Sequence, residues 1–267
     1  MVADVSSFIP SLQPSLTVER HRYIHVIGSS VFVSDHVEIE TAEHHFLGSF
    51  TTDMGSEAVW AVDVPQGEDP SFGAAIDLFT YFGRASEEEW AIAGRAVQLA
   101  EWARTHRFCG RCGTPTERSA NDRSMTCPAC KLLAYPRLAP AMITLITRGT
   151  GADSEALLAR GVQFRAPMYS CLAGFVEPGE SLEQSVIREV REEVGVEIDT
   201  PTYVSSQPWP FPHSLMLGFR ARWLSGDIVC DPTEIMDAQW YRRDELPNIP
   251  PRISIARKLI DMWVAEG

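Results

Sequence analysis

The chain has few basic residues. Its 267 residues include 23 Lys and Arg against 36 Asp and Glu, which gives a formal net charge of −13 at pH 7. This balance argues against general binding to duplex nucleic acid, because such binding depends on lysines and arginines that contact the phosphates. Small anionic ligands are not excluded, since bound metal ions can reverse the charge of a site locally.

Long apolar runs are also missing. No run approaches the roughly 18 residues that a membrane-spanning helix requires, so we expect no membrane partner. The first 20 residues contain no Lys or Arg before Arg20 and no apolar core of signal-peptide length. We therefore expect a cytoplasmic protein. The 45% of hydrophobic and 22% of charged residues are ordinary for a globular protein with a real core.

Cysteine is scarce outside one cluster. Of six cysteines, Cys171 and Cys230 stand alone, and in a reducing compartment we expect them to be small buried apolar residues. The other four form two C-x2-C pairs separated by fourteen residues. Each pair lies on a tight turn that brings two thiolates together, and two such turns form the tetrahedral site that Zn²⁺ accepts. The predicted ligands of one zinc ion are Cys109, Cys112, Cys127 and Cys130.

Four protein ligands leave no open position for water or substrate, so the predicted zinc site is structural. Iron or a redox dithiol pair is the alternative for these cysteines. Zinc ribbons often bind nucleic acid, but this one carries a thin basic patch that is interrupted by acidic residues. We therefore favour a ribbon that stabilises the fold between two larger parts. The charged residues of the ribbon are Arg111, Arg118, Arg123 and Lys131, against Glu117 and Asp122.

The chain divides into three expected domains. Residues 1–105 form a β-rich N-terminal domain that ends in a helix, residues 106–135 the zinc ribbon, and residues 136–267 an α+β domain. In the first domain, β-branched and aromatic residues predict strands within 22–34 and 58–65. A helix is predicted over 86–107, where Ser86 and Glu89 make a capping box.

The third domain alternates predicted strands and helices. Apolar runs predict strands at 138–147, 156–160 and 215–224. A terminal helix is predicted at 251–266, and a further helix lies between the second and third of these strands. The mixed order supports an α+β fold.

That further helix carries the segment REVREEVG. Ser181 and Gln184 make a capping box, and Gly195 provides a C-terminal stop, so the helix is predicted at 182–194. Three glutamates share one of its faces, beside the apolar stripe of Leu182, Val186 and Val190. The glutamates on that face are Glu189, Glu192 and Glu193, and Glu180 lies just before the helix.

Two interpretations of this acidic face are possible. A solvated face is the common one, but it would place Lys four residues after Glu, whereas Glu189 is followed at that spacing by Glu193. Carboxylates clustered without basic partners suit Mg²⁺ or Mn²⁺. We therefore interpret this face as a metal site that brings a polyphosphate to the helix.

A second unusual segment, SQPWPFPHS at 206–214, contains three prolines. We expect these prolines to hold an extended backbone that cannot pair inside a sheet. Their spacing places Trp209 and Phe211 on one side. Without further information, this is a stiff loop that packs two aromatic rings.

Residues 173–196 resemble the Nudix box, G-x5-E-x7-R-E-U-x-E-E-x-G-U, in which U is aliphatic. Residues 206–214 are similar to the SQPWPFPxS signature of the NADH pyrophosphatases of the Nudix superfamily, which also carry a four-cysteine zinc ribbon before the box. The resemblance implies a Nudix α/β/α sandwich preceded by the zinc ribbon and the β-rich domain. The box positions are filled by Gly174, Glu180, Arg188, Glu189, Val190, Glu192, Glu193, Gly195 and Val196.

The resemblance also assigns roles to single residues. It implies that Arg188 orients the catalytic glutamates and that Glu192 is a further metal ligand or a base. Several Mg²⁺ or Mn²⁺ ions would be bound by Ala173 (through its backbone), Glu189, Glu192, Glu193 and Glu234. Phe175 and Tyr135 would stack on the nicotinamide. The remaining substrate residues would be Asp122, Gln207, Pro208, Trp209, Pro210, Phe211, Pro212, His213, Ser214 and Ala256, of which Asp122 only stands near a family Glu and His213 occupies a variable position.

The implied activity is metal-dependent hydrolysis of the diphosphate bond of NADH or NAD⁺, which yields nicotinamide mononucleotide and AMP. The family also removes NAD caps from RNA 5′ ends. The alternatives are a Nudix hydrolase with another main substrate, such as ADP-ribose, and a non-catalytic zinc-ribbon module that binds nucleic acid. The resemblance further suggests a homodimer.

Overall fold

A computed structural model of the chain describes residues 8–14, 18–37, 39, 42–52, 55–65, 74–164 and 166–267. The chain forms two compact units, residues 1–137 and residues 138–267. The predicted boundary between residues 105 and 106 lies inside the first unit, and the three-domain division stays a prediction.

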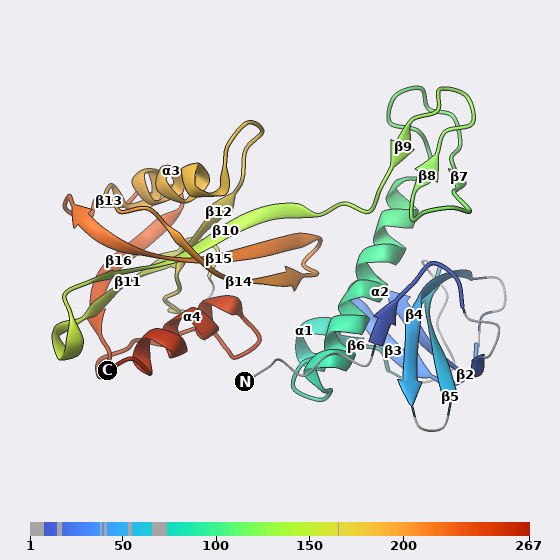
Figure 1. Cartoon of the computed structure of the whole chain (residues 1–267), viewed down its shortest axis with the longest axis horizontal. Coiled ribbons are helices and arrows are strands. Elements are labelled where there is room, and N and C mark those ends of the chain that lie inside the picture. The colour runs from blue at the N-terminus through green and yellow to red at the C-terminus, as the bar shows by residue number, and fades with distance from the viewer. Residues whose placement is uncertain are drawn as a thin grey trace. The chain divides into compact units, whose positions relative to one another are not determined.

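The first unit is built on a six-stranded sheet with the order β1-β4-β5-β2-β3-β6 (Figure 1). Strands β2 and β5 run parallel, and the remaining neighbours are antiparallel. The predicted strand region at 22–34 is a hairpin of β2 and β3. The bounds are β1 (Phe8–Pro10), β2 (Val18–Ile27), β3 (Ser30–Ser34), β4 (Glu43–Thr52), β5 (Gly55–Asp63) and β6 (Ile76–Asp77).

Helix α2 (Glu87–Thr105) packs against this sheet, after the short α1 (Leu78–Tyr81). The predicted capping box is present, since the Ser86 side chain accepts from the Glu89 N–H and Glu89 accepts from the Ser86 N–H. Ten α2 residues are buried, mostly Ala, Leu, Ile, Val and Trp, which explains why the helix packs along most of its length.

A small three-stranded sheet follows α2 in the chain and carries the cysteine turns. Its strands are short and antiparallel, as expected where a metal site replaces a hydrophobic core. The bounds are β7 (Glu117–Arg118), β8 (Met125–Thr126) and β9 (Leu133–Ala134).

The second unit is a mixed seven-stranded sheet with a helix on each face (Figure 1). At its centre β10 runs parallel to β15, and β11 and β12 pair antiparallel with different parts of β10. This is the predicted α/β/α sandwich. The bounds are β10 (Ala139–Arg148), η1 (Gly151–Asp153), β11 (Glu155–Gly161), β12 (Leu172–Phe175), α3 (Leu182–Val194), β13 (Glu197–Ile198), β14 (Thr202–Trp209), β15 (Ser214–Ser225), β16 (Ile235–Arg242) and α4 (Ile255–Val264).

Successive side chains of β10 point to opposite faces of the sheet, so the second unit has two hydrophobic cores. Met142 and Ile146 face α3, where they pack with Val186 and Val190, and Val194 completes the same cluster. The intervening side chains of β10 face α4. That second cluster includes Ile143, Leu145, Ala156, Leu158, Cys171, Leu259, Ile260 and Trp263. The sheet therefore fixes α3 rigidly through its apolar stripe.

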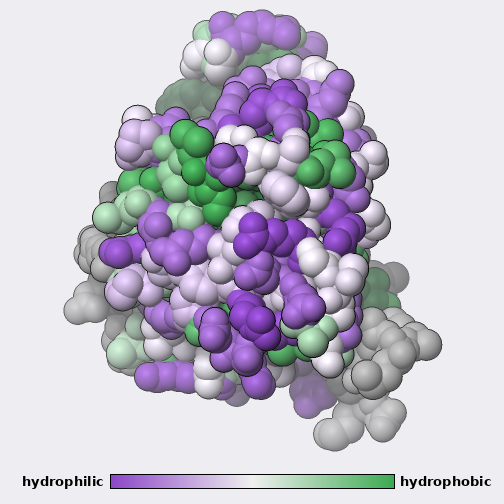
Figure 2. Space-filling view, turned by 90° about the vertical axis from the view of Figure 1, so that its left-hand side faces the viewer, coloured by the Kyte–Doolittle hydropathy of each residue, from purple (hydrophilic) through white to green (hydrophobic). Residues whose placement is uncertain are grey.

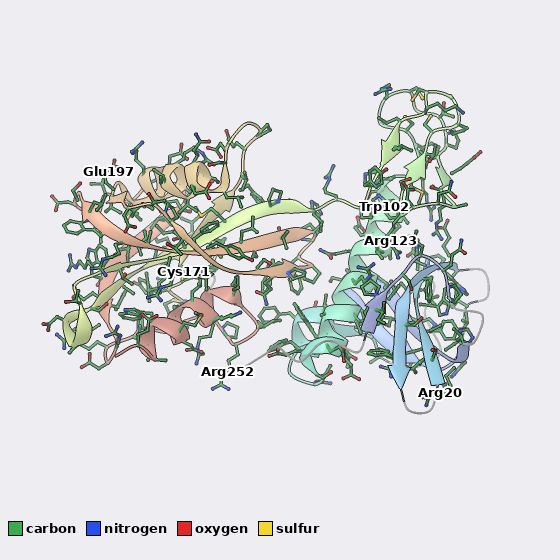
Figure 3. All side chains as sticks on the ribbon, viewed as in Figure 1. Arg20, Trp102, Arg123, Cys171, Glu197 and Arg252 are labelled. Carbon is green, nitrogen blue, oxygen red and sulfur yellow. The ribbon has the colours of Figure 1, made fainter. Side chains whose placement is uncertain are left out.

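Cys171 lies in the second core, between the sheet and α4 (Figure 3). Burial raises the pKa of its thiol to about 12, and its Sγ lies 3.8 Å from the carbonyl oxygen of Ala256 on α4. It is thus the small buried residue that the sequence predicts. Cys230 is only partly buried and packs at the edge of the first core.

The proline segment differs from its prediction. Pro208 and Trp209 belong to β14, which pairs antiparallel with β15 and places Pro208 opposite Leu215. The prediction that these prolines cannot pair in a sheet is therefore wrong for Pro208. Because β14 is an edge strand that pairs only with β15, the missing N–H of a proline can point away from the ladder.

On the face shown in Figure 2, hydrophilic side chains cover most of the surface and hydrophobic ones form patches between them. This fits the acidic composition of the chain. Within the described ranges, no helix has the length and apolar character needed to cross a membrane.

Candidate active site and metal centres

Helix α3 begins and ends where the sequence predicts. The Ser181 side chain accepts from the Gln184 N–H, Gln184 accepts from the Ser181 N–H, and Gly195 ends the helix with φ of 72°. Both ends are thus fixed by local hydrogen bonds. The glutamates between them are held at defined positions relative to the sheet.

Gly174 of β12 lies directly beneath Glu189. A Cβ atom at Gly174 would come within 2.0 Å of the Glu189 carboxyl carbon and 2.2 Å of its Oε1. Only glycine therefore allows this carboxylate to lie against the strand. Glu189 is 9% exposed, and this burial raises its pKa.

Glu193 is the most buried acid of the site, with 6% exposure. Its Oε2 has no hydrogen-bond donor among the described residues. Burial, together with the charges of Glu189 and Glu234, raises the pKa of Glu193 to about 8. A buried carboxylate oxygen without a donor is what a cation site requires, so the residues fit a divalent metal.

Arg188 contacts three of the four helix-region acids. Its guanidinium donates to Glu180 at 2.5 and 2.9 Å and to Glu192 at 2.8 Å, and it lies 3.0 Å from Glu189 Oε1. It also donates to the carbonyl oxygen of Phe175 at 3.0 Å. The Arg188 guanidinium lowers the pKa of Glu180 to about 2. Arg188 thus orients carboxylates, as the family resemblance implies.

The glutamates differ in burial. Glu189 and Glu193 are buried, whereas the Glu192 side chain is 59% exposed. Glu234 lies in the turn before β16, and its charge raises the pKa of both Glu189 and Glu193, so the fold brings it to the same site. Ala173 and Phe175 flank Gly174 in β12 and are both exposed.

Asp231 is a residue that the sequence reasoning missed. Its N–H donates to the Glu193 carbonyl oxygen at 3.0 Å, and its own carbonyl oxygen accepts from the N–H of Glu234 at 3.2 Å. Its carboxylate accepts from the N–H and the hydroxyl of Thr233. Asp231 therefore links the end of α3 to the turn that carries Glu234. The sequence signal was the Asp-Pro-Thr turn directly before Glu234.

The four cysteines form a second centre, in the first unit. All four Sγ atoms lie within 4.8 Å of one another, with Cys109–Cys130 and Cys112–Cys127 separations of 3.5 Å. Backbone N–H groups of Arg111 and Cys130 point at two of the sulfurs. Tetrahedral Zn–S bonds of about 2.3 Å place sulfurs at similar separations. This is the predicted closed metal site.

The predicted substrate residues divide between the two units. In the first, the Tyr135 hydroxyl donates to Asp122 at 3.1 Å, so these two residues are neighbours. The others lie in the second unit. The Trp209 and Phe211 rings contact each other with centroids 5.0 Å apart, as predicted.

Gln207 bridges the proline segment to α4. Its side-chain amide donates to the Ile253 carbonyl oxygen at 2.7 Å and accepts from the Ile255 N–H at 2.8 Å. Ala256 is buried in the first turn of α4, and Pro210 and Ser214 are also buried. Pro208 and Pro212 are exposed, and His213 is partly exposed, with its carbonyl oxygen bonded to the N–H of Ala139.

Comparison with known proteins agrees with this geometry. The NUDIX domain family matches residues 137–262, the NADH pyrophosphatase zinc ribbon domain matches 104–135, and the NADH pyrophosphatase-like rudimentary NUDIX domain matches 24–102. A protein of Stutzerimonas stutzeri named NAD-capped RNA hydrolase NudC is 56% identical over 189 residues, which are 71% of this chain and 67% of that protein. The chain belongs to the NUDIX hydrolase family, in the branch with the NADH pyrophosphatase zinc ribbon.

A second curated relative supports the same placement. The NAD-capped RNA hydrolase NudC of Deinococcus radiodurans is 48% identical over 208 residues, which are 78% of this chain and 74% of that protein. The crystal structure of a NUDIX hydrolase from Nitrosomonas europaea is 21% identical and covers 60% of this chain and 91% of that one, with a TM-score of 0.49. The family resemblance inferred from the sequence is confirmed.

Proposed function

We propose that this NUDIX hydrolase cleaves the diphosphate bond of NADH or NAD⁺ to nicotinamide mononucleotide and AMP, and that it removes NAD caps from RNA 5′ ends. The NudC relatives at 48 and 56% identity support this substrate class. The observation that carries the proposal is the pair of buried carboxylates on α3: Glu193 Oε2 has no hydrogen-bond donor among the described residues, and Gly174 leaves room for the neighbouring Glu189.

We further propose that Glu189, Glu192, Glu193 and Glu234, with the backbone of Ala173, hold several Mg²⁺ or Mn²⁺ ions. Such ions, when bound, neutralise phosphate charge and lower the pKa of water. Oxygen donors of this kind suit hard divalent cations. The zinc of the ribbon would remain structural, because its four thiolates leave no open position.

The protein's own groups act on position and protons. Arg188 holds Glu180, Glu189 and Glu192 and so fixes the carboxylates before substrate arrives. Glu192 is exposed, with Oε2 bonded to Arg188, and its carboxylate can accept a proton from attacking water. The exposed Phe175 and Tyr135 offer flat faces on which a nicotinamide or adenine ring can stack.

The test is incubation of purified protein with NADH, NAD⁺, ADP-ribose or NAD-capped RNA in Mg²⁺ or Mn²⁺, with AMP and mononucleotide identified by mass spectrometry. We expect AMP from NADH and 5′-phosphorylated RNA from the capped transcript. Arg257→Gln is the matched control, since this partly buried arginine pairs with Asp261 on α4, away from the carboxylates of α3. Absence of AMP from every dinucleotide would refute the proposal.

The kcat/KM values across the same panel rank the substrates. A preference for ADP-ribose would favour the alternative Nudix substrate named from the sequence. RNA binding without turnover would favour the non-catalytic zinc-ribbon module. The intact set of glutamates argues against that module.

We propose that the protein acts in the cytoplasm as a homodimer. Free thiols and a four-thiolate metal site suit a reducing compartment. The dimer rests on the family resemblance, and light scattering coupled to size-exclusion chromatography measures it directly. A mass of about one chain, 29.7 kDa, would contradict it.

A further inference from the structure

The side-chain amide of Gln207 is engaged at both its nitrogen and its oxygen by the backbone at the start of α4. Its Nε2 donates to the carbonyl oxygen of Ile253, and its Oε1 accepts from the N–H of Ile255. These bonds join residues 46 and 48 positions apart in the chain. Ile253 and Ile255 are only 2% and 4% exposed, so both backbone groups depend on this one amide for a hydrogen bond.

This contact completes the N-terminal cap of α4 from a distant strand. The first N–H groups of a helix have no acceptor within the helix itself. The Ser254 side chain accepts from the N–H of Ala256 at 3.2 Å, whereas the N–H of Ile255 donates to Gln207. The residues next to α4 therefore supply only part of its cap, and β14 supplies the rest.

A glycine allows β14, β15 and α4 to approach closely at this point. Gly218 of β15 is paired with Ser205 of β14. A Cβ atom added to Gly218 would lie 2.9 Å from Ile255 Cδ1 and 3.1 Å from the carbonyl oxygen of Ser205. The missing side chain thus leaves room for Ile255 to pack on the sheet within reach of Gln207.

Gln207 lies on the same face of the sheet as the predicted nicotinamide-stacking residue. Four residues on neighbouring strands are in register and form one row across that face. They are Phe175, Ala141, Met216 and Gln207. A strand spacing of about 4.8 Å places the two ends of this row about 14 Å apart. Trp209, two residues after Gln207 on β14, points to the same face.

We propose that Gln207 is a positioning residue that assembles one wall of the substrate pocket by tying the end of β14 to the start of α4. This inference rests on the proposed function. It replaces the substrate contact that the family resemblance implies for Gln207 with a role as support for Trp209 and for the first turn of α4. The two bonds fix both of these elements at once, although they are far apart in the chain.

The proposed role concerns substrate affinity and leaves the chemical step to other residues. Glu189 lies against Gly174, which is paired with Met142, and Met142 belongs to the core between the sheet and α3. The carboxylate is therefore on the opposite face of the sheet from the Gln207 amide. Loss of the amide should displace the pocket wall and leave the glutamates in place.

The test combines amide hydrogen exchange with steady-state kinetics on the full, zinc-loaded chain. Gln207→Leu keeps an apolar side chain of similar length and removes both bonds. We expect the Ile255 N–H to exchange at least about tenfold faster without substrate, because its buried donor loses its acceptor. The N–H of Leu259, in the middle of α4, should exchange as in the wild type. With NADH and Mg²⁺, KM should rise about tenfold while kcat stays within about twofold.

Two further variants complete the design. Gln239→Leu is the matched control, since this exposed glutamine bonds to Asp237 on its own strand, and it should leave both measurements unchanged. Gln207→Glu can accept from the Ile255 N–H but cannot donate to the Ile253 carbonyl oxygen. Its KM should therefore rise at least about threefold, which keeps the proposal testable even where Gln207→Leu does not fold.

The outcomes separate this proposal from the proposed function. In an active enzyme, unchanged exchange at Ile255 in Gln207→Leu would show that the amide does not hold α4. Faster exchange with a wild-type KM, or a wild-type KM in Gln207→Glu, would show that the start of α4 does not shape the pocket. Each of these results overturns the positioning role alone. A wild type that does not hydrolyse NADH refutes the proposed function, and the role in substrate affinity with it.

Discussion

At the scale of single residues, the site depends on one missing side chain. The Glu189 carboxylate fills the space that a side chain at position 174 would need, because a Cβ added to Gly174 would lie 2.0–2.4 Å from the carboxylate atoms. The neighbour that must move is the end of a flexible side chain. The cost of a larger residue at position 174 therefore falls on the placement of Glu189, and less on the fold.

We predict that Gly174→Ala folds normally but loses activity. The free energy of unfolding should change by less than about 1 kcal/mol, whereas kcat/KM for NADH should fall about 100-fold, since small misplacements of catalytic groups have effects of this size. Chemical denaturation and steady-state kinetics measure the two quantities. In the control Gly110→Ala the added methyl meets open space, so activity should persist. Equal activities in the two variants would contradict the prediction.

Glu193 should make the metal-free protein less stable as the pH rises. Its pKa is raised from 4.5 to about 8, so between these values the folded state holds a proton that the unfolded state has released. The stabilisation present below pH 4.5 is therefore lost as the pH passes through 8.

Glu193→Gln removes this pH dependence. We expect the variant to exceed the wild type by about 1–3 kcal/mol in free energy of unfolding at pH 8, with EDTA present, and to match it near pH 5. Urea denaturation at several pH values provides the measurement. The exposed Glu192→Gln is the control and should show a small effect. If the free energies of unfolding of the wild type and Glu193→Gln changed with pH in parallel, the pKa of Glu193 would not be raised by burial. With Mg²⁺ present, kcat should fall strongly.

At the scale of elements, the turn between β15 and β16 matters most. Asp231 joins the carbonyl oxygen of Glu193 to the N–H of Glu234, and its carboxylate stiffens the turn through Thr233. Through these bonds the turn sets the separation of two predicted metal ligands that come from different elements.

We predict that Asp231→Ala weakens Mg²⁺ or Mn²⁺ binding and lowers kcat/KM by about tenfold, the usual effect of removing a group that orients ligands. Asp231→Asn should recover much of this loss, because its amide oxygen can accept the same bonds. Isothermal titration with metal separates ligand placement from folding, and the exposed Asp227→Ala is the control. If Asp231→Asn lowers metal binding and kcat/KM as much as Asp231→Ala does, the hydrogen bonds of this side chain are not what matters, and its charge acts in some other way.

The elements also show how far sequence reasoning reaches. Helix α3 was predicted with its observed bounds because both of its ends are set by local hydrogen bonds. The terminal helix was predicted at 251–266 but spans Ile255–Val264, since Ser254 caps it after two prolines. Strand β14 was missed because its pairing depends on an edge position that no local pattern reveals.

In the candidate site too, features set by neighbouring residues could be predicted, whereas contacts between residues far apart in the chain could not. Its glutamates are recognisable from helical spacing. The backbone hydrogen bond between Asp231 and Glu193 joins residues more than thirty positions apart, which single-sequence patterns do not predict. The sequence therefore identified the chemistry of the site, whereas its supporting contacts required the structure.

At the scale of the whole molecule, the metal of the ribbon stabilises more than its own turns. Arg118 and Arg123 lie between the two cysteine pairs and donate to carbonyl oxygens of His44, Phe46 and Ser11. Because Cys109 and Cys127 are buried at the ribbon centre, loss of zinc should also release these contacts.

We predict that zinc removal by a strong chelator, or Cys127→Ser, lowers the melting temperature of the first unit by about 10 °C or more. Differential scanning calorimetry should then show two transitions, one for each compact unit. Cys230→Ser is the matched control, since this thiol is separate from the cluster. An unchanged melting temperature after verified zinc loss would show that the ribbon is dispensable for stability.

The thiol of Cys171 is sealed between the sheet and α4, beside the carbonyl oxygen of Ala256. An alkylating reagent can reach this thiol only when α4 opens locally away from the sheet, so the labelling rate measures the frequency of that opening. If nicotinamide dinucleotides lodge against Gln207 and the start of α4, substrate should slow the labelling of Cys171 in proportion to occupancy. The labelling rate of this one thiol thus reports how often the hydrolase domain opens at α4.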